Sequence, residues 1–320
     1  MTKINSNEKH SIYISTRLFI YRVRRLFGDI LQYYRNFNKL NRSYNNPLKI
    51  LLFPILGGLL GRAHVINMPR KYWNTLIWVT DIYDLGAELS WADDSLCIAF
   101  EGTIFTSNAY DSSLHTVFTE AFQIDEYGIG DARFDGMTIL DVGANIGDSA
   151  VMFLNKGAYR VHSFEPMPSI FRYLTKTLKL NNIEPYVDTH CVGLSGEDEI
   201  VDVWFRQAGS AGSSPTLHTG EDYNRVGYIK ESIQLVDTQR YLQKHNISKV
   251  DVIKMDCEHC EYVLFRNGRL LQMLNPQLVY LEYHAGPKPL IKVLEKNGYD
   301  VRVTEKNPRV GVLYASKSSA

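Results

Sequence analysis

The chain has 320 residues, of which 45% are hydrophobic and 22% charged, an ordinary balance for a globular protein. This length holds one large domain or two modest ones. The formal net charge is zero, so no field of the whole molecule attracts nucleic acid. We therefore expect no nucleic-acid partner.

The charge is uneven along the chain. Residues 1–50 carry ten lysines and arginines against two acids, a balance of +8, so the remaining residues carry −8. Within this basic stretch, residues 11–40 mix apolar and basic positions at near-helical spacing. For the segment 1–45 we favour an amphipathic helix packed on its own domain. The alternative is a helix that docks on a membrane surface or a protein partner.

Cysteine usage and hydropathy bear on the location. The four cysteines form no disulfide framework by number or spacing, and the polar start shows no secretory signal. The longest apolar run, 50–60, is too short to span a bilayer. We expect a cytoplasmic protein, peripheral to the membrane only if its basic segment binds lipid.

Residues 46–125 have the character of an accessory region or cap. The pair Asn46-Pro47 breaks the first helix, and the apolar run 48–60 after it is a helix or a strand. Short strands are predicted at 76–79 and 97–100, followed by a turn at Glu101-Gly102.

Residues 126–320 form the predicted main domain. Strands and helices alternate there, which predicts a doubly wound α/β fold: a mostly parallel sheet of seven strands, antiparallel at its last strand, with helices on both faces. The predicted strands are 138–142, 160–164, 187–192, 250–255, 278–283, 300–303 and 310–315. The predicted helices are 148–156, 168–180, 260–274 and 289–297. Between the third and fourth strands lies an insert with strands at 200–206 and 232–236, whose polar stretch 209–220 is either a lid or a plain hairpin tip.

The most informative stretch is 138–148, where an apolar run ends in Gly143-x-Asn145-x-Gly147 and leads into a predicted helix. Glycines at such a turn let a bulky ligand lie against the backbone where the strand ends. About 20 residues later, the next apolar run ends in Glu165, which is placed to accept hydrogen bonds from two ribose hydroxyls. Together these features predict a nucleoside cofactor.

Two acids, Asp141 and Asp148, bracket the glycine turn beside Asn145. In a dinucleotide site such acids would repel the pyrophosphate that the turn must hold. They suit a cation instead, such as the ammonium and sulfonium of S-adenosylmethionine. We favour that cofactor over NAD.

At this point the chain resembles the FkbM-type methyltransferases over roughly residues 115–315. The matching motifs are Asp141-x-Gly143-x-Asn145-x-Gly147-Asp148, Phe164-Glu165-Pro166, the run 251–262 and Leu281-Glu282-Tyr283-His284. The resemblance implies methyl transfer from S-adenosylmethionine to the oxygen of a sugar, a glycan or a secondary metabolite. The chain departs from the family at 257–261, which reads Cys-Glu-His-Cys-Glu where the family usually reads Val-Glu-Gly-Ala-Glu.

Open parallel sheets bind ligands beyond the carboxyl ends of their strands. We expect the methionine part of the cofactor at the turn from Asp141 to Asp148, the ribose at Glu165 and the adenine against the backbone near Val192. The family often carries an acid in the region of Glu120, which either covers the cofactor or is an exposed helix acid.

The catalytic candidates follow the fourth and fifth parallel strands. Asp256 is expected beside the cofactor and the transferring methyl group, with Glu258 or His284 as the base for a substrate hydroxyl. The alternative role for Glu258 is a helix-start acid favoured by the helix dipole. Lys254 is expected either to point away from the buried face of the chain or to pair with an acid, and we assign it no chemistry.

The motif Cys257-x-x-Cys260 suggests a metal or redox role, but no second pair at zinc spacing exists and the nearby acids oppose thiolate formation. We favour ordinary packing at a helix start. A divalent ion held by Asp256, Glu258, Glu282 and His284 stays an alternative that no spacing demands, so we expect no metal. Two other functions stay open: a nicotinamide-dependent oxidoreductase, and a non-catalytic module that acts through its basic arm.

Overall fold

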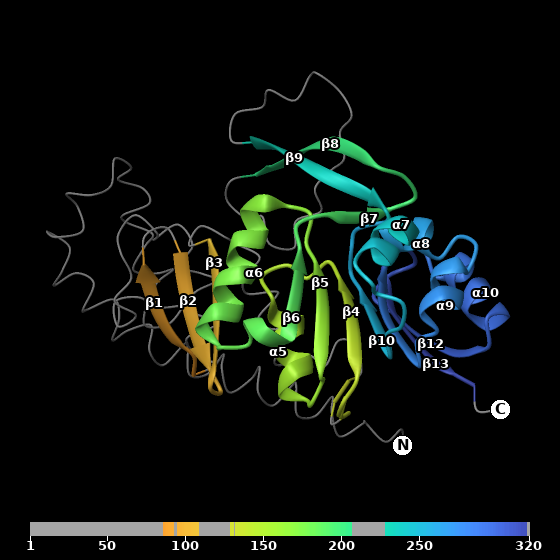
Figure 1. Ribbon diagram of the computed structural model, residues 1–320, viewed down its shortest axis with the longest axis horizontal. Coiled ribbons are helices and arrows are strands. Elements are labelled where there is room, and N and C mark those ends of the chain that lie inside the picture. Colours follow the sequence, from red (N-terminus) through yellow and green to blue (C-terminus); the bar gives the residue numbers. More distant parts are fainter. Residues whose placement is uncertain (1–85, 93–94, 109–128, 131, 207–227, 319–320) are drawn as a thin grey trace, which may run out of the picture. The chain divides into compact units, whose positions relative to one another are not determined.

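The computed structural model describes residues 86–92, 95–108, 129–130, 132–206 and 228–318. The chain divides into two compact units, Met1–Asp94 and Ser95–Ala320, and the first contributes one described strand, β1 (Glu88–Ala92). The elements expected within residues 1–85, the acid Glu120 and the polar stretch 209–220 lie outside the described residues. All other described elements belong to the second unit (Figure 1).

The second unit is built on a seven-stranded sheet in the order β12-β13-β11-β10-β4-β5-β6. Its strands are β4 (Thr138–Val142), β5 (Arg160–Phe164), β6 (Val187–His190), β10 (Val252–Met255), β11 (Leu278–Tyr283), β12 (Tyr299–Glu305) and β13 (Gly311–Lys317). Of these seven strands, only β13 runs antiparallel, inserted between β11 and β12. The sheet confirms the predicted doubly wound α/β fold.

The chain order around β4 creates the place where ligands bind in such sheets. From β4 the chain builds outward through β5 and β6, then crosses back to place β10 on the other side of β4. Both neighbours pair with β4 in parallel, so their carboxyl ends meet at one edge. This is a topological switch point, where a crevice opens beyond the strand ends.

Helices cover both faces of the sheet (Figure 1). On one face α5 (Asp148–Asn155) and α6 (Pro168–Leu180) bury Phe153 and Leu174 against Ile139 and other strand residues. On the opposite face, Leu140 belongs to a core with α7 (Thr238–Lys244), α8 (Cys260–Leu264), α9 (Arg269–Leu274) and α10 (Lys288–Lys296). Successive strand residues point to opposite faces, which is why these strands are apolar at consecutive positions.

The predicted long helix 260–274 is wrong, because the structure divides it into α8 and α9. Gly268 precedes α9 with φ 71°, a left-handed conformation that glycine adopts without steric cost. The break leaves α8 as a five-residue helix directly behind the carboxyl end of β10. Among the described residues, none of the helices has the length and apolar character that a bilayer crossing requires.

The insert forms a small second sheet in the order β7-β9-β8. It consists of β7 (Gly193–Ser195), β8 (Glu199–Arg206) and β9 (Tyr228–Asp237). β8 and β9 contain the two predicted strands 200–206 and 232–236 and pair antiparallel, and β7 adds to β9 in parallel. A Cβ on Gly193 of β7 would stand 2.5 Å from Leu235 Cδ2, so any larger residue there would displace the Leu235 side chain.

A hairpin of β2 (Ser95–Phe100) and β3 (Thr103–Asn108) lies in the same compact unit as the large sheet. Its two-residue turn, Glu101-Gly102, has positive φ at both positions, as the turn chemistry predicts. β3 runs beside α6, where the side chain of Asn181 accepts a hydrogen bond from the N–H of Ile104 (2.9 Å) and donates one to its carbonyl oxygen (2.6 Å).

Candidate active site

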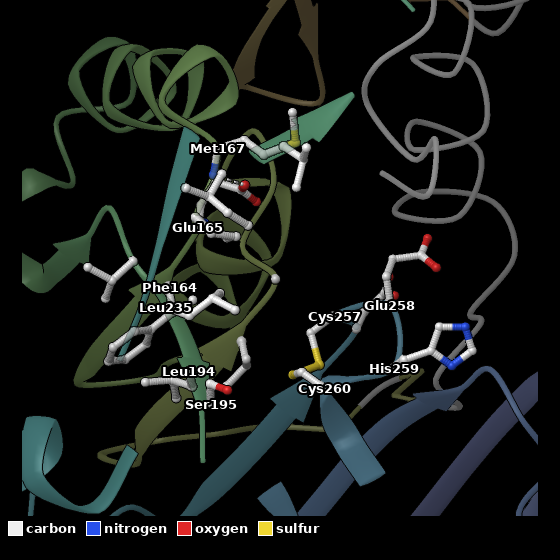
Figure 2. Close-up of a pocket in the computed structure, with 18 of the residues that line it drawn as sticks. Phe164, Glu165, Met167, Leu194, Ser195, Leu235, Cys257, Glu258, His259 and Cys260 are labelled. Carbon is white, nitrogen blue, oxygen red and sulfur yellow. Dashed lines mark hydrogen bonds between the residues drawn. A yellow bond between two sulfur atoms is a disulfide. The ribbon is translucent and has the colours of Figure 1, made fainter. Parts of the chain in front are cut away.

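A cavity of about 410 Å³ opens beyond the carboxyl ends of β4, β5 and β10. Figure 2 shows Glu165 and Met167 on one side of it and the turn from Cys257 to Cys260 on the other. The small sheet closes a further side with apolar residues: Leu194, Val203, Ile233 and Leu235. The predicted cofactor residues that line this cavity are Gly143, Asn145, Glu165, Val192 and Asp256.

The glycine turn after β4 lies in contact with the end of β10. The N–H of Asp256 donates to the carbonyl oxygen of Val142 (2.9 Å), and this hydrogen bond holds the two segments together. A Cβ on Gly143, whose φ is +80°, would stand 1.7 Å from the carbonyl oxygen of Asp256. Glycine is therefore required at 143 by both its conformation and its close neighbour.

Glu165 is fixed at the wall of the cavity by two backbone donors. Its carboxylate accepts hydrogen bonds from the N–H groups of Asn145 (3.0 Å) and Met167 (2.9 Å). Burial raises the pKa of Glu165 to about 7, although these two hydrogen bonds and the charge of Lys254 act in the opposite direction. A carboxylate held this way keeps free lone pairs for the vicinal hydroxyls of a ribose.

Asp141 lies beneath the turn and is not among the residues that line the cavity. The hydroxyl of Ser149 donates to its Oδ2 (2.7 Å), and the ammonium of Lys254 lies 3.3 Å from its Oδ1. The same ammonium donates to the carbonyl oxygen of Gly143 (2.8 Å). Burial by itself would lower the pKa of Lys254, but the charges of Asp141, Asp256 and Asp148 together outweigh burial and the pKa is raised. This buried pair supports the glycine turn from below, and it confirms that Lys254 pairs with an acid.

Gly147 and Asp148 also lie behind the wall of the cavity. Gly147 (φ 90°) is the N-cap of α5 and Asp148 its first residue. The buried Oδ1 of Asp148 has no hydrogen-bond partner among the described residues. Burial raises the pKa of Asp148 to about 6, with Lys254 lowering it and Asp141 raising it.

The catalytic candidates form one cluster with an acid that sequence reasoning did not select. His284 Nε2 lies 3.4 Å from Glu258 Oε2 and 3.9 Å from Asp256 Oδ1. On its other side, both the backbone N–H and Nδ1 of His284 lie 3.0 Å from Glu261 Oε1. Glu261 is fully buried, so the histidine is held from below by an acid and faces two more acids at the cavity.

The acids around His284 favour its protonated form. Burial would lower its pKa, but the hydrogen bond to Glu261 and the charges of Glu258 and Asp256 outweigh burial and raise the pKa to about 9. The imidazole is therefore protonated at neutral pH and offers no free lone pair to a substrate proton. The sequence contained one signal for this arrangement, the position of Glu261 in the first turn of a predicted helix. Acids are common at helix starts, so this signal did not single out Glu261.

The turn between β10 and α8 has an unusual backbone. Glu258 and His259 have φ values of 53° and 82°, in the left-handed region that side-chain-bearing residues rarely adopt. Each such residue costs roughly 1–3 kcal/mol of backbone strain. His259 thus holds a backbone conformation that glycine would adopt without steric cost.

A disulfide joins Cys257 and Cys260 across this turn, with their Cα atoms 5.5 Å apart. The expectation of ordinary helix-start packing is therefore wrong for this pair. The Cα separation falls within the ordinary range for a disulfide, and the spacing of two intervening residues brings the cysteines together only because the turn is tight. Cys97 and Cys191 are free.

Three side chains, Asp256, Glu282 and His284, place their ligand atoms within 4.8 Å of one another, a donor set that a divalent ion can use. Glu282 already has a cation, because the ammonium of Lys306 lies 2.8 Å from its Oε1. Both ring nitrogens of His284 also lie close to carboxylates, Nδ1 at 3.0 Å from Glu261 and Nε2 at 3.4 Å from Glu258. These residues fit an internal charge network better than a metal site.

The charges that line the cavity suit a cationic ligand. Among the described lining residues, the carboxylates are Glu165, Glu199, Asp256 and Glu258, and there is no lysine or arginine. A sulfonium or ammonium is stabilised in such surroundings, whereas a pyrophosphate is repelled. Together with a carboxylate placed for a ribose, the residues fit S-adenosylmethionine.

Solved structures with a similar arrangement include several methyltransferases. One is a methyltransferase FkbM from Methylobacillus flagellatus KT, 13% identical, with a TM-score of 0.42, covering 83% of this chain and 59% of that one. Another is M. jannaschii TYW2 in complex with AdoMet, 14% identical, with a TM-score of 0.40, covering 71% and 87%. A third is M. jannaschii tRNA m1G37 methyltransferase, 12% identical, with a TM-score of 0.40, covering 72% and 57%.

Sequence comparison gives the family. No curated protein matches the chain. The model of the methyltransferase FkbM domain matches residues 141–301, which include the glycine turn, Glu165 and the whole acidic cluster around His284. Because this match spans just over half of the 320 residues, the chain belongs to the FkbM methyltransferase family, whose cofactor is S-adenosylmethionine.

Proposed function

We propose that the protein transfers a methyl group to a hydroxyl oxygen of a sugar, a glycan or a secondary metabolite. The observation that carries this proposal is that Asp256 and Glu258 line the same cavity as Glu165. The acids suited to a substrate hydroxyl thus share one cavity with the acid suited to the cofactor ribose. When bound, S-adenosylmethionine supplies the electrophilic methyl group on its sulfonium.

The geometry favours Glu258 over His284 as the base. His284 is protonated at neutral pH because of the surrounding carboxylates, and Glu261 occupies its Nδ1. Glu258 is partly exposed at the cavity, so its carboxylate can accept the proton of a hydroxyl. The imidazolium then lies beside Glu258 and holds that carboxylate in place.

The lining charges also define the class of acceptor. Four carboxylates around a cavity of this size repel a phosphate or a second carboxylate on the acceptor. An uncharged hydroxyl compound avoids this repulsion. We therefore infer a neutral acceptor, with sugar phosphates and nucleic acids disfavoured.

The test is transfer of label from methyl-labelled S-adenosylmethionine to a panel of hydroxyl compounds. Neutral sugars and polyols are paired in this panel with their phosphorylated forms. We expect label on the oxygen of a neutral member and little on its phosphorylated partner. Label transferred only to amines, or only to phosphorylated acceptors, would contradict the proposal.

A matched pair of variants tests the base. We expect Glu258→Gln to lower the transfer rate about 10²- to 10⁴-fold, the range that a positioned base contributes, with cofactor affinity kept. Glu197→Gln removes an exposed acid that does not line the cavity, so it serves as the control. An unchanged rate in Glu258→Gln would exclude Glu258 as the base.

A further inference from the structure

The turn that presents Glu258 to the cavity is closed by a disulfide. Cys257 and Cys260 enclose Glu258 and His259, and all four residues line the cavity. In Figure 2 the disulfide faces the cavity, opposite Leu194 and Ser195. Both cysteines are partly exposed, so a small thiol that enters the cavity can reach the bond. Exposed disulfides of this kind are the labile ones in proteins.

The backbone of this turn depends on a constraint. Two successive residues with side chains, Glu258 and His259, hold left-handed conformations that favour glycine. The disulfide fixes the distance between the residues on either side of them, and α8, which follows, has only five residues to anchor the turn. Without the bond, Glu258 and His259 are free to return to ordinary φ values. The carboxylate of Glu258 then leaves its position 3.4 Å from His284.

We propose that Cys257 and Cys260 form a reversible thiol–disulfide site that holds Glu258 in place, so that the oxidised protein is the competent methyltransferase and reduction lowers its rate. The effect on rate rests on the proposed function, whereas the effect on the turn does not. The reductant is a dithiol. Its two thiols give two electrons and two protons to the bond, the S–S bond of the protein breaks into two thiols, and the reductant leaves as a cyclic disulfide.

The residues around the disulfide favour a regulatory role for it. They do not favour catalysis of dithiol–disulfide exchange. An exchange catalyst needs a stabilised thiolate. Here Glu261 Oε2 lies 3.6 Å from Cys257 Sγ, and Asp256 and Glu258 are the immediate neighbours in sequence. These carboxylates disfavour a thiolate, so after reduction the pair stays as thiols until an oxidant acts.

The first test measures the redox state and the conformation of the turn, with dithiothreitol as the reductant. Thiol titration of the unfolded protein is expected to find two free cysteines before reduction and four after it. Amide hydrogen exchange over residues 258–264 is expected to become about tenfold faster or more in the reduced protein. The variant Cys257→Ser/Cys260→Ser should match the reduced protein without any reductant. Four free thiols before reduction, or equal exchange in both forms, would overturn the proposal.

A second variant isolates the backbone strain as the cause. His259→Gly replaces one of the two strained residues with one that adopts the left-handed conformation freely, so its turn should hold its conformation better after reduction. The difference in exchange between oxidised and reduced protein is therefore expected to be smaller in His259→Gly than in the unmodified protein. It should persist in Cys97→Ser/Cys191→Ser, which lacks only the free cysteines. A difference as large in His259→Gly as in the unmodified protein would show that backbone strain at His259 is not what the disulfide opposes.

Rate and cofactor affinity separate this inference from the proposed function. On an acceptor found in the panel, we expect the reduced protein to transfer methyl groups about tenfold more slowly or worse, the loss of a positioned base being at least that large. If neither form binds S-adenosylmethionine, the proposed function fails while the exchange result stands. If both forms bind it and transfer methyl groups equally fast, the redox control of the rate is wrong.

Discussion

The carbonyl oxygen of Asp256 occupies the space that a Cβ on Gly143 would need, with only 1.7 Å between the two positions. The first residue after β4 and the first residue after β10 therefore touch through their backbones. This contact brings the glycine turn, expected to hold the cofactor, next to the acids proposed for catalysis. Because Gly143 has no side chain, the turn expected to bind the cofactor and the acids proposed for catalysis can line a single cavity.

Gly143→Ala is predicted to destabilise the protein strongly. Alanine pays about 1–2 kcal/mol for the left-handed conformation and typically 1–3 kcal/mol more for forcing neighbouring backbone apart. Gly136→Ala is the matched control, because Gly136 has φ +73° but a Cβ added there would meet no atom within 4 Å. Chemical denaturation measures both, and equal losses in the two variants would contradict the close approach.

Lys254→Met is predicted to cost about 3–5 kcal/mol of folding free energy, since it leaves Asp141 as an unpaired buried charge. Adding Asp141→Asn should recover part of this loss. The control is Lys230→Met, which breaks an exposed pair with Asp202 and should cost about 0–1 kcal/mol. A small effect of Lys254→Met in urea denaturation would mean that the pair does not support the turn.

His284 is predicted to titrate near pH 9, which NMR of its ring protons can follow. Glu261→Gln should lower this pKa, because it removes the carboxylate hydrogen-bonded to Nδ1. Glu295→Gln, an exposed acid on α10, should leave it unchanged. A pKa near the usual 6.5 in the unmodified protein would restore His284 as a candidate base.

The same group is predicted to make stability depend on pH. The pKa of His284 is higher in the folded protein, about 9, than the ordinary value of 6.5. Its contribution to stability is therefore complete below pH 6.5 and is lost as the pH rises through 9. The free energy of unfolding should fall over this window in the unmodified protein and fall less in His284→Asn. Equal slopes in both proteins would count against the charge network.

The sequence predicted the strand framework well for a physical reason. Thr138–Val142 and Leu278–Tyr283 match their predicted bounds, because strands buried on both faces carry apolar residues at consecutive positions. Arg160–Phe164 matches as well, although polar residues interrupt its apolar pattern. The long helix 260–274 was wrong despite a visible signal. Asn267-Gly268 is a turn pair, and the apolar periodicity on both sides of it concealed the break.

The local chemistry of the site was harder to predict. The roles of Lys254 and Glu261 depend on which face of a strand or helix each side chain occupies. A single sequence does not show which of its charged side chains are buried. The Cys257–Cys260 disulfide closes a turn in which Glu258 and His259 have left-handed backbones. Neither residue type favours that conformation, so the sequence carried no signal for the turn beyond the position of the family's glycine.

The proposed function depends most directly on Glu165 as the ribose-binding acid of an S-adenosylmethionine site. Calorimetry of cofactor binding with unmodified protein, Glu165→Gln and the control Glu197→Gln tests it. Loss of hydrogen bonds to a charged group costs about 1.5–3 kcal/mol, so Glu165→Gln should bind roughly ten- to hundredfold more weakly, with Glu197→Gln unchanged. Binding to unmodified protein should also weaken below pH 7, where Glu165 takes up a proton. Equal affinity in all three proteins, or no binding by the folded unmodified protein, would contradict this role of Glu165.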